Sequence, residues 1–335
     1  MSLFDADRSA ERTPVTVLTG FLGSGKTTLL NGLLRQPDLA DSAVIINEFG
    51  EIGLDHLLVE RVDGEMVVLQ SGCVCCSVRS DLESALRKLL AERDKGTIPA
   101  FRRVMLETTG LADPAPIMQM LLANPLVAHF CTLGGVVATV DAPYGAQHLA
   151  ELREARKQVA LADRIVLTKL DLEPAARAAL ERAVRGLNEV APLVAAEHGR
   201  VAANQVISAT AATSRVAEEI GHYHEHAHTP DIGSFFLTAD APLDWLAVQS
   251  WLAQVRASFG AGLLRVKGLL NLRDETAPVV VHGVHHVFHP PVRLERWPSE
   301  DRRSRLVFIV RELDPAPIRE SFAALSARPR ALATR

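Results

Sequence analysis

The chain has 335 residues, of which 48% are hydrophobic, and its formal charge is −4. This length permits one sizeable core and a smaller one, while the negative charge and the lack of a basic run with interleaved aromatic residues argue against a nucleic-acid partner. Residues 1–13 resemble neither a signal peptide nor a transit peptide, and no run of about eighteen apolar residues could span a membrane, so we expect a cytoplasmic protein.

The first predicted element is a short buried strand at residues 15–18, followed by a glycine-rich loop and an apolar helix. Residues 20–27 read GFLGSGKT, which fits the phosphate-binding pattern G-x-x-x-x-G-K-[ST] throughout and disfavours a plain glycine turn. The glycines let backbone N–H groups surround phosphate oxygens, and the positive end of the helix dipole faces them. The residues expected to hold the phosphates are Gly20, Gly23, Ser24, Gly25, Lys26, Thr27 and Thr28. We therefore predict a nucleoside triphosphate site, with Lys26 on the β- and γ-phosphates and Thr27 on Mg²⁺.

A second parallel strand is predicted at residues 43–46. It brings the segment NEFGEIGLD, residues 47–55, to the carboxyl end of the sheet, the edge where doubly wound folds bind ligands. The glycines and carboxylates of this segment suit a mobile switch that can coordinate a cation. The alternative is a solvated acidic loop.

Strands predicted at residues 57–62 and 66–69 lead into the sequence SGCVCCS, where Cys73, Cys75 and Cys76 form a cluster of thiols. Thiolates are soft ligands that select Zn²⁺, Cu⁺ and related ions. Because the loop offers one cluster and no second pair, its fourth ligand must be water, a histidine, an incoming ligand or a carboxylate such as Glu48. Such a site is open and can release its metal. A redox pair or inert buried thiols are the alternatives, and Cys131 is expected to be a buried small hydrophobe.

A helix is predicted at residues 78–93, and the strand that follows, residues 102–106, ends in the sequence ETTGLADP. An acidic residue at this position is where phosphate-loop enzymes place the carboxylate that holds Mg²⁺, directly or through water. Glu107 is therefore expected to support Mg²⁺ or the attacking water. Gly110 can present its N–H group to the γ-phosphate, which makes this loop a second switch.

Two more parallel strands are predicted at residues 135–141 and 164–167, with a helix at residues 146–162 between them. The second strand ends in the sequence TKLD, where Asp171 can accept hydrogen bonds from N1–H and N2–H of guanine, and Lys169 can pack along the base. A further short strand is predicted at residues 205–207, after which Ser208 and Ala209 would offer a backbone N–H to guanine O6. GTP is therefore the expected nucleotide.

The rest of the chain is predicted to be a linker and a second domain. Residues 221–230 contain four histidines, which either collect metal loosely or simply belong to a solvated tether. The predicted elements beyond are strands at 233–237, 263–272, 278–288 and 306–311 and helices at 243–258 and 317–326. Four histidines, His282, His285, His286 and His289, are expected on both faces of the third strand. The predicted architecture is an α/β phosphate-loop domain with a mainly parallel sheet (1–220), a linker (221–230) and a smaller α+β domain (231–335) that recognises partners.

Taken together, the phosphate loop, the 47–55 segment, the C-x-C-C cluster, the ETTGLADP segment and the TKLD sequence resemble the CobW-like metallochaperone GTPases, relatives of the urease and hydrogenase nickel-insertion GTPases. The resemblance extends over nearly the whole chain, including a CobW-type C-terminal domain. It implies a GTPase with Mg²⁺ that loads zinc, or alternatively cobalt, iron or nickel, into a metal-dependent client protein, and it allows a metal-dependent homodimer. The departure is Thr168, where the family usually has Asn, and we expect it to loosen a contact to the phosphate loop.

In this reading Lys26, Thr27 and Glu107 carry the chemistry, Thr168, Lys169 and Asp171 face guanine, and the three clustered cysteines hold metal. Two other classes of function stay open. A metal-storage or metal-sensing module would bind GTP with negligible turnover even when metal and client are present. A GTPase with a redox switch would respond to peroxide and not to a chelator.

Overall fold

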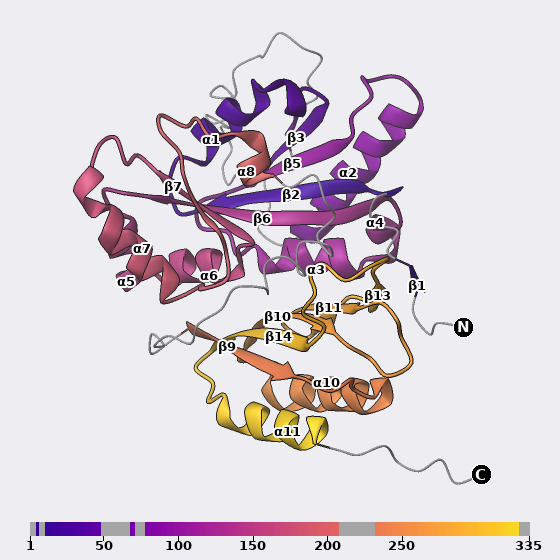
Figure 1. Ribbon diagram of the computed structural model, residues 1–335. Helices are drawn as coiled ribbons and strands as arrows, with labels where there is room; N and C mark the ends of the chain where they lie inside the picture. Colours follow the sequence, from indigo (N-terminus) through magenta and orange to yellow (C-terminus); the bar gives the residue numbers. More distant parts are fainter. Residues whose placement is uncertain (1–4, 7–10, 48–67, 71–77, 208–231, 328–335) are drawn as a thin grey trace. The chain divides into compact units, whose positions relative to one another are not determined.

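The computed structural model describes residues 5–6, 11–47, 68–70, 78–207 and 232–327. The chain divides into two units, Arg8–Ala212 and Met1–Asp7 with Thr213–Arg335. Each unit has a sheet of its own, coloured indigo to pink in the first and orange to yellow in most of the second (Figure 1). The first sheet is parallel and the second mainly antiparallel, which confirms the predicted fold class.

The strands of the first unit pair in the order β4-β3-β5-β2-β6-β7-β8, and every described pairing is parallel. Their bounds are β2 Thr13–Gly20, β3 Ser42–Asn47, β4 Val68–Gln70, β5 Arg103–Thr108, β6 Cys131–Asp141, β7 Arg164–Thr168 and β8 Leu193–Ala195. Strand order reverses about β2, which places the loop after β2 between the loops after β5 and β6. Ligands of such sheets bind at this carboxyl edge.

Helices cover both faces of this sheet: in Figure 1, α1 lies above the strands and α3 and α6 lie below them. The helices are α1 Lys26–Leu34, α2 Val78–Asp94, α3 Ala115–Ala123, α4 Pro125–Phe130, α5 Gly145–Glu151, α6 Arg153–Leu161, α7 Arg177–Arg185 and α8 Ala203–Val206, with short 3₁₀ turns at Pro37–Leu39 and Pro174–Ala176. On the upper face, Leu29 and Leu33 of α1 pack with Leu18, Val44 and Ile46 in one buried cluster. Because both faces are covered, the strands are continuous apolar runs, as a buried parallel sheet requires.

Two predicted elements of this unit are wrong. The helix expected at residues 146–162 is two helices, because Leu152 takes an extended conformation with φ −109° and ψ 123° between α5 and α6. The strand expected at residues 205–207 is instead the end of the helical turn α8. Ile207 N–H donates to Ala203 O at 2.7 Å, and Gln36 accepts from Ala203 N–H, so local and tertiary hydrogen bonds outweigh the β-propensity of the segment.

Cys131 is fully buried at the start of β6, as expected for a small hydrophobe. Burial raises the pKa of its thiol to about 11, although the charge of Arg93 opposes this shift. A thiol with this pKa stays neutral near pH 7 and is a poor nucleophile. Cys131 is therefore a residue of the core.

The second unit has strands in the order β1-β13-β11-β10-β14-β9, with β12 paired to β11. The bounds are β1 Asp5–Ala6, β9 Ile232–Ala239, β10 Leu263–Leu270, β11 Val279–Val284, β12 Val287–Phe288, β13 Val292–Arg293 and β14 Ser304–Arg311, with helices α10 Trp245–Phe259 and α11 Ala316–Ser326. All described strand pairings are antiparallel except that of β1 with β13. Strand β1 therefore belongs to this sheet, although its residues lie in the span expected for the first domain.

The two helices of the second unit lie together on one face of its sheet (Figure 1). The Trp251 ring of α10 meets Phe308 of β14 edge to face, with 6.0 Å between ring centroids, and its indole N–H donates to Ser321 Oγ of α11. Asp244 caps α10 by accepting from Ala247 N–H. These contacts bury the apolar side of each element and build a separate core.

The single strand expected at residues 278–288 is a hairpin of β11 and β12. Its turn is formed by His285 and His286, and His285 has a left-handed φ of 52°. The four histidines therefore do not decorate one strand. His282 is buried with its Nε2 3.3 Å from a guanidinium nitrogen of Arg265, and His289 donates its backbone N–H to His282 O.

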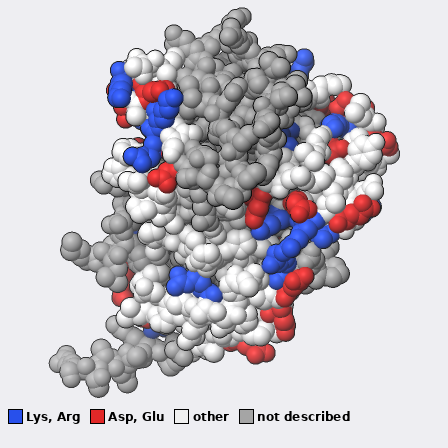
Figure 2. All heavy atoms as spheres, turned by 180° about the vertical axis from the view of Figure 1, so that it is seen from behind, with Lys and Arg blue, Asp and Glu red and all other residues white. Residues whose placement is uncertain are grey.

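Positive and negative side chains of the described residues are interspersed on the face shown in Figure 2. This mixture agrees with the small net charge of the chain. None of the described helices combines the length and apolar character needed to cross a membrane.

Candidate functional site

The glycine loop after β2 adopts the backbone conformation that its sequence predicts. Gly20, Gly23 and Gly25 have φ values of 142°, 70° and 91°, which other residues rarely adopt. At Gly20 the restriction is also steric, because a Cβ there would lie 2.3 Å from Thr139 Oγ1. Helix α1 begins at Lys26, directly after Gly25, so the loop ends at a helix N-terminus. This is the geometry of an anion cradle.

Hydroxyl groups fix the floor of this loop to the neighbouring strands. Ser24 Oγ lies 2.6 Å from Thr139 Oγ1 of β6, and Thr168 Oγ1 of β7 donates to Ser24 O at 2.7 Å. Thr168 therefore contacts the phosphate loop directly, although it stands where the family usually has Asn. All three side chains are buried.

Thr27 and Glu107 meet at the carboxyl edge of the sheet. Thr27 Oγ1 donates to Glu107 Oε1 at 2.7 Å, although the two residues belong to different elements, α1 and β5. Glu107 is only 3% exposed. A hydroxyl and a carboxylate are the hard oxygen donors that Mg²⁺ prefers, so this donor set fits the ion.

Lys26 is held close to the loop that it follows. Its Nζ donates to Phe21 O at 3.2 Å, and the residue is 9% exposed. A buried ammonium over a phosphate cradle exerts its charge in a medium of low dielectric constant, where the attraction to an anion is strong. Lys26 is therefore placed to act on phosphate oxygens.

The predicted guanine-reading segment is tied to the same loop. Lys169 has a left-handed φ of 55°, its Nζ donates to Gly23 O at 2.6 Å, and it lies 4.0 Å from Asp141 Oδ2. Asp171, two residues on, has its Oδ2 3.3 Å from His198 Nδ1. The structure thus connects the TKLD segment to the phosphate loop at Gly23 and Ser24, through Lys169 and Thr168 respectively.

The loop after β5 packs against the phosphate loop at Gly110. A Cβ at Gly110 would lie 2.6 Å from Leu22 N, so only glycine fits there. Gln158 of α6 is buried and donates its side-chain amide to the carbonyls of Gly110 and Ala112, both at 3.0 Å, and Lys157 forms an ion pair with Asp113. Sequence reasoning missed Gln158, because nothing in the periodicity of α6 distinguishes it from other polar residues.

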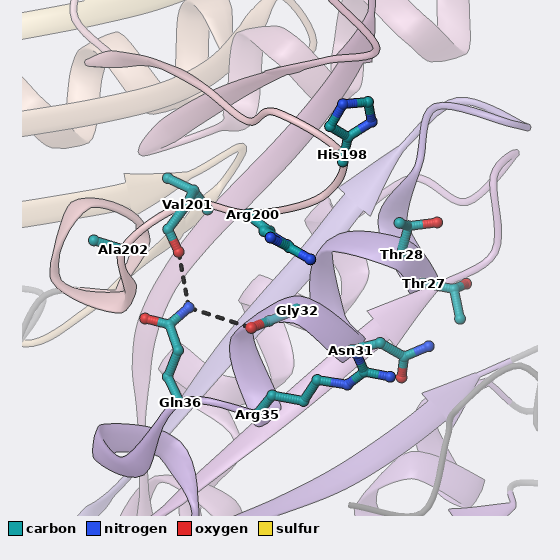
Figure 3. Close-up of a pocket in the computed structure, with 10 residues that line it drawn as sticks. All are labelled: Thr27, Thr28, Asn31, Gly32, Arg35, Gln36, His198, Arg200, Val201 and Ala202. Carbon is teal, nitrogen blue, oxygen red and sulfur yellow. Dashed lines mark hydrogen bonds between the residues drawn. The ribbon is translucent and has the colours of Figure 1, made fainter. Parts of the chain in front are cut away.

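A cavity of about 880 Å³ opens beside α1 (Figure 3). The described residues that line it are Thr27, Thr28, Asn31, Gly32, Arg35, Gln36, His198, Arg200, Val201 and Ala202. Gln36 anchors one wall, since its amide donates to Gly32 O and Val201 O while its Oε1 accepts from Ala203 N–H. The cavity runs from the Thr27 end of the phosphate site to the basic side chains of Arg35 and Arg200.

Comparison with known proteins identifies the family of this chain. The model of the CobW/HypB/UreG nucleotide-binding domain matches residues 14–195. The chain belongs to the CobW/HypB/UreG family. The C-terminal domain model named for the cobalamin synthesis protein cobW matches residues 232–326, so the resemblance seen in the sequence is confirmed.

Among curated relatives of this CobW-family chain, the zinc chaperone YjiA of Escherichia coli (strain K12) is 35% identical over 314 residues, 93% of this chain and 98% of YjiA. The zinc chaperone CobW of Pseudomonas aeruginosa is 28% identical over 348 residues, 93% of this chain and 91% of that protein. A solved structure of the Zn(II)-bound YjiA GTPase from E. coli superposes with a TM-score of 0.70 at 30% identity, covering 94% of this chain and 99% of the other.

Several residues predicted for the CobW-family site lie outside the described residues. These are Glu48, Cys73, Cys75 and Cys76 for metal, and Ser208 and Ala209 for guanine. Within the described part of the chain, no group of three or more His, Cys, Asp or Glu side chains is arranged to hold a metal ion. The predicted metal site therefore rests on the sequence.

Proposed function

We propose that this CobW-family protein is a GTP-hydrolysing metallochaperone that holds zinc at its C-x-C-C cluster and delivers it to a metal-dependent client protein. The observation that carries the GTPase part is the hydrogen bond from Thr27 to Glu107. It joins the start of the phosphate-loop helix to the carboxylate of an adjacent strand, where a nucleotide-bound Mg²⁺ needs its ligands.

Each residue of the proposed nucleotide site has a role set by its chemistry. The backbone of Gly20, Gly23 and Gly25 surrounds the phosphates, and the Lys26 ammonium balances charge that develops on the β- and γ-phosphate oxygens. Thr27 and Glu107 hold Mg²⁺, which when bound neutralises charge on the same oxygens. Ser24 on the loop and Thr28 in the first turn of α1 supply the remaining side chains of the cradle.

Asp171 selects guanine by accepting from N1–H and N2–H, which adenine does not offer. Because Lys169 Nζ donates to Gly23 O, a base that packs on the Lys169 side chain would be held in a fixed position relative to the phosphates. Gly110 packs against the backbone of Leu22 and presents its N–H to the γ-phosphate, while Ser208 or Ala209 contributes a backbone donor to guanine O6.

Zinc is the cargo in this proposal and not a resident cofactor. Cys73, Cys75 and Cys76 supply three soft ligands within four residues, and Glu48 supplies the fourth position or leaves it open to a client ligand. The zinc chaperones YjiA and CobW support zinc over cobalt, iron or nickel. The second unit, which contains the predicted C-terminal domain at residues 231–335 together with β1, would recognise the client. Residues 221–230 would tether that domain to the GTPase domain, predicted at residues 1–220.

The metal half of the proposal is tested by removing ligands. Cys75→Ser combined with Cys76→Ser is expected to weaken zinc binding by more than the roughly 10–100-fold that the loss of an outer-shell partner costs, because two thiolate ligands are lost. Affinity is measured by titration against a competing zinc chelator.

Cys131→Ala is the matched control, since it removes a thiol from the core and is expected to leave zinc affinity unchanged. Equal zinc affinity in the wild type and the double variant would place the metal elsewhere. The metal-storage alternative predicts tight zinc binding with no GTP turnover in any metal or client condition.

A further inference from the structure

A tight turn, residues 197–200, lies at the guanine end of the site and was not predicted. His198 and Gly199 both have positive φ, 51° and 74°. Glu197 and Arg200 exchange backbone hydrogen bonds, at 3.2 Å from Glu197 N–H and 2.8 Å from Arg200 N–H. Two positive-φ residues closed by such a pair form a type I′ hairpin turn.

The neighbouring strand places this turn beside the TKLD segment. β8 pairs in parallel with β7, with Leu167 opposite Ala195. The turn begins two residues after Ala195, and the TKLD segment begins one residue after Leu167. Because parallel strands end at the same edge, the turn borders the segment that contains Asp171.

The other side of the turn is seated on the phosphate-loop helix. A Cβ at Gly199 would lie 2.7 Å from Thr28 Cγ2, and a Cβ at Gly32 would lie 2.3 Å from Gly199 O. Glycine is therefore required on both partners for this close approach. The turn is fixed against α1 while its first central residue, His198, faces Asp171.

His198 lies beside Asp171 while its backbone has a left-handed φ, a conformation that costs free energy for any residue with a side chain. Its Nδ1 lies 3.3 Å from Asp171 Oδ2. Asn and Gly suit the first central position of a type I′ turn better than His does. Unfavourable backbone geometry of this kind concentrates at functional sites, and here it coincides with a contact to the guanine-reading carboxylate.

We propose that His198 is a specificity-determining positioning residue: its imidazole, with Nδ1 3.3 Å from Asp171 Oδ2, holds the carboxylate so that both oxygens face N1–H and N2–H of guanine. This inference rests on the proposed GTP binding. Each carboxylate oxygen has two acceptor sites, so Oδ2 can accept from His198 and from the base together. A carboxylate that rotates freely still accepts from N1–H but loses the aligned second bond to the 2-amino group.

The discriminating experiment compares GTP with ITP, whose base lacks the 2-amino group, for binding to the full chain. His198→Gly removes the imidazole and also relieves the positive φ, so the turn keeps its shape. Since the His198 side chain is 75% exposed, GTP affinity is expected to fall only about two- to fivefold. ITP affinity should change little, so the ratio of GTP affinity to ITP affinity should fall by the same factor as GTP affinity.

Two further variants separate positioning from stability. His198→Asn tolerates the left-handed conformation and places an amide N–H where Nδ1 was, so it should restore the preference. Glu312→Gly relieves a similar φ of 48° in the other unit and should leave both affinities unchanged. kcat with saturating GTP should be the same in all four proteins.

The role of His198 would be overturned if the wild type prefers GTP to ATP and His198→Gly keeps the wild-type ratio of GTP affinity to ITP affinity. An equal loss of affinity for GTP and ITP leaves that ratio unchanged and would overturn it in the same way. A wild type with equal affinity for GTP and ATP would instead contradict the proposed function.

Discussion

Lys26→Ala is expected to lower kcat for GTP hydrolysis by a factor of about 10²–10³, the size of effect seen when one preorganised charge or donor is removed from a developing anion. The side chain is buried over the phosphate loop and held by Phe21 O, so its ammonium is already in place before the substrate arrives. The loss should therefore fall on kcat more than on folding. Phosphate release at saturating GTP measures it.

Lys88→Ala is a suitable control, because this lysine lies exposed on α2 in a surface pair with Glu92. Such pairs contribute little, so turnover and stability should stay at the wild-type level. Zinc affinity of Lys26→Ala without nucleotide should also be unchanged, since the cysteines are separate from the phosphate cradle in sequence. Turnover that survives Lys26→Ala would show that the phosphate loop does not carry the chemistry.

Asp171→Asn is expected to weaken GTP binding by a factor of about 10²–10⁴, because each hydrogen bond to a charged group contributes about 1.5–3 kcal/mol and two are lost or mismatched. The new amide presents a donor where guanine also presents one. Xanthine has a carbonyl at that position, so XTP should bind the variant better than GTP does. Competition between GTP, XTP and ATP for a fluorescent nucleotide gives all three affinities.

The control for the change in nucleotide preference is Glu173→Gln. It removes one negative charge without changing the size of the side chain, on the exposed turn that follows Asp171. It should keep the wild-type order of nucleotides. Indistinguishable GTP and ATP affinities in both the wild type and Asp171→Asn would mean that Asp171 does not read the base.

The phosphate loop and the parallel strands were predictable because their signals are local. Glycines at fixed spacing, followed by Lys26 and Thr27, specify both the backbone and the ligand groups, and buried strands are uninterrupted apolar runs. Glu107 was predictable for the same reason, since it ends such a run. Its hydrogen bond to Thr27 confirms that the two side chains meet.

The errors came from segments whose conformation depends on distant contacts. Residues 205–207 have the composition of a strand, yet Gln36, far away in the chain, holds the preceding turn in a helix. β8 is an edge strand of only three residues that directly follows Pro192, so its short apolar run does not by itself identify a strand. The turn at residues 197–200 was also missed, because its close approach to Gly32 depends on another element and leaves no local pattern in the sequence.

The proposal as a whole requires that GTP changes the affinity for zinc. The loop with Gly110 touches the phosphate loop at Leu22 and is held by Gln158, so it is placed to respond to a γ-phosphate. A nucleotide can shift metal affinity only through different affinities for the metal-holding and metal-releasing states, and zinc must change GTP affinity by the same factor. A coupling of about 1–3 kcal/mol, or roughly 5–150-fold, is typical.

The most direct test is a zinc titration against a competing chelator with the wild-type protein in three states: without nucleotide, with a non-hydrolysable GTP analogue and with GDP, each with Mg²⁺. A difference of at least about fivefold between the GTP-analogue and GDP states is expected, matched by an equal change in analogue affinity when zinc is added. Equal zinc affinity in all three states, with a client protein present, would contradict GTP-controlled metal transfer.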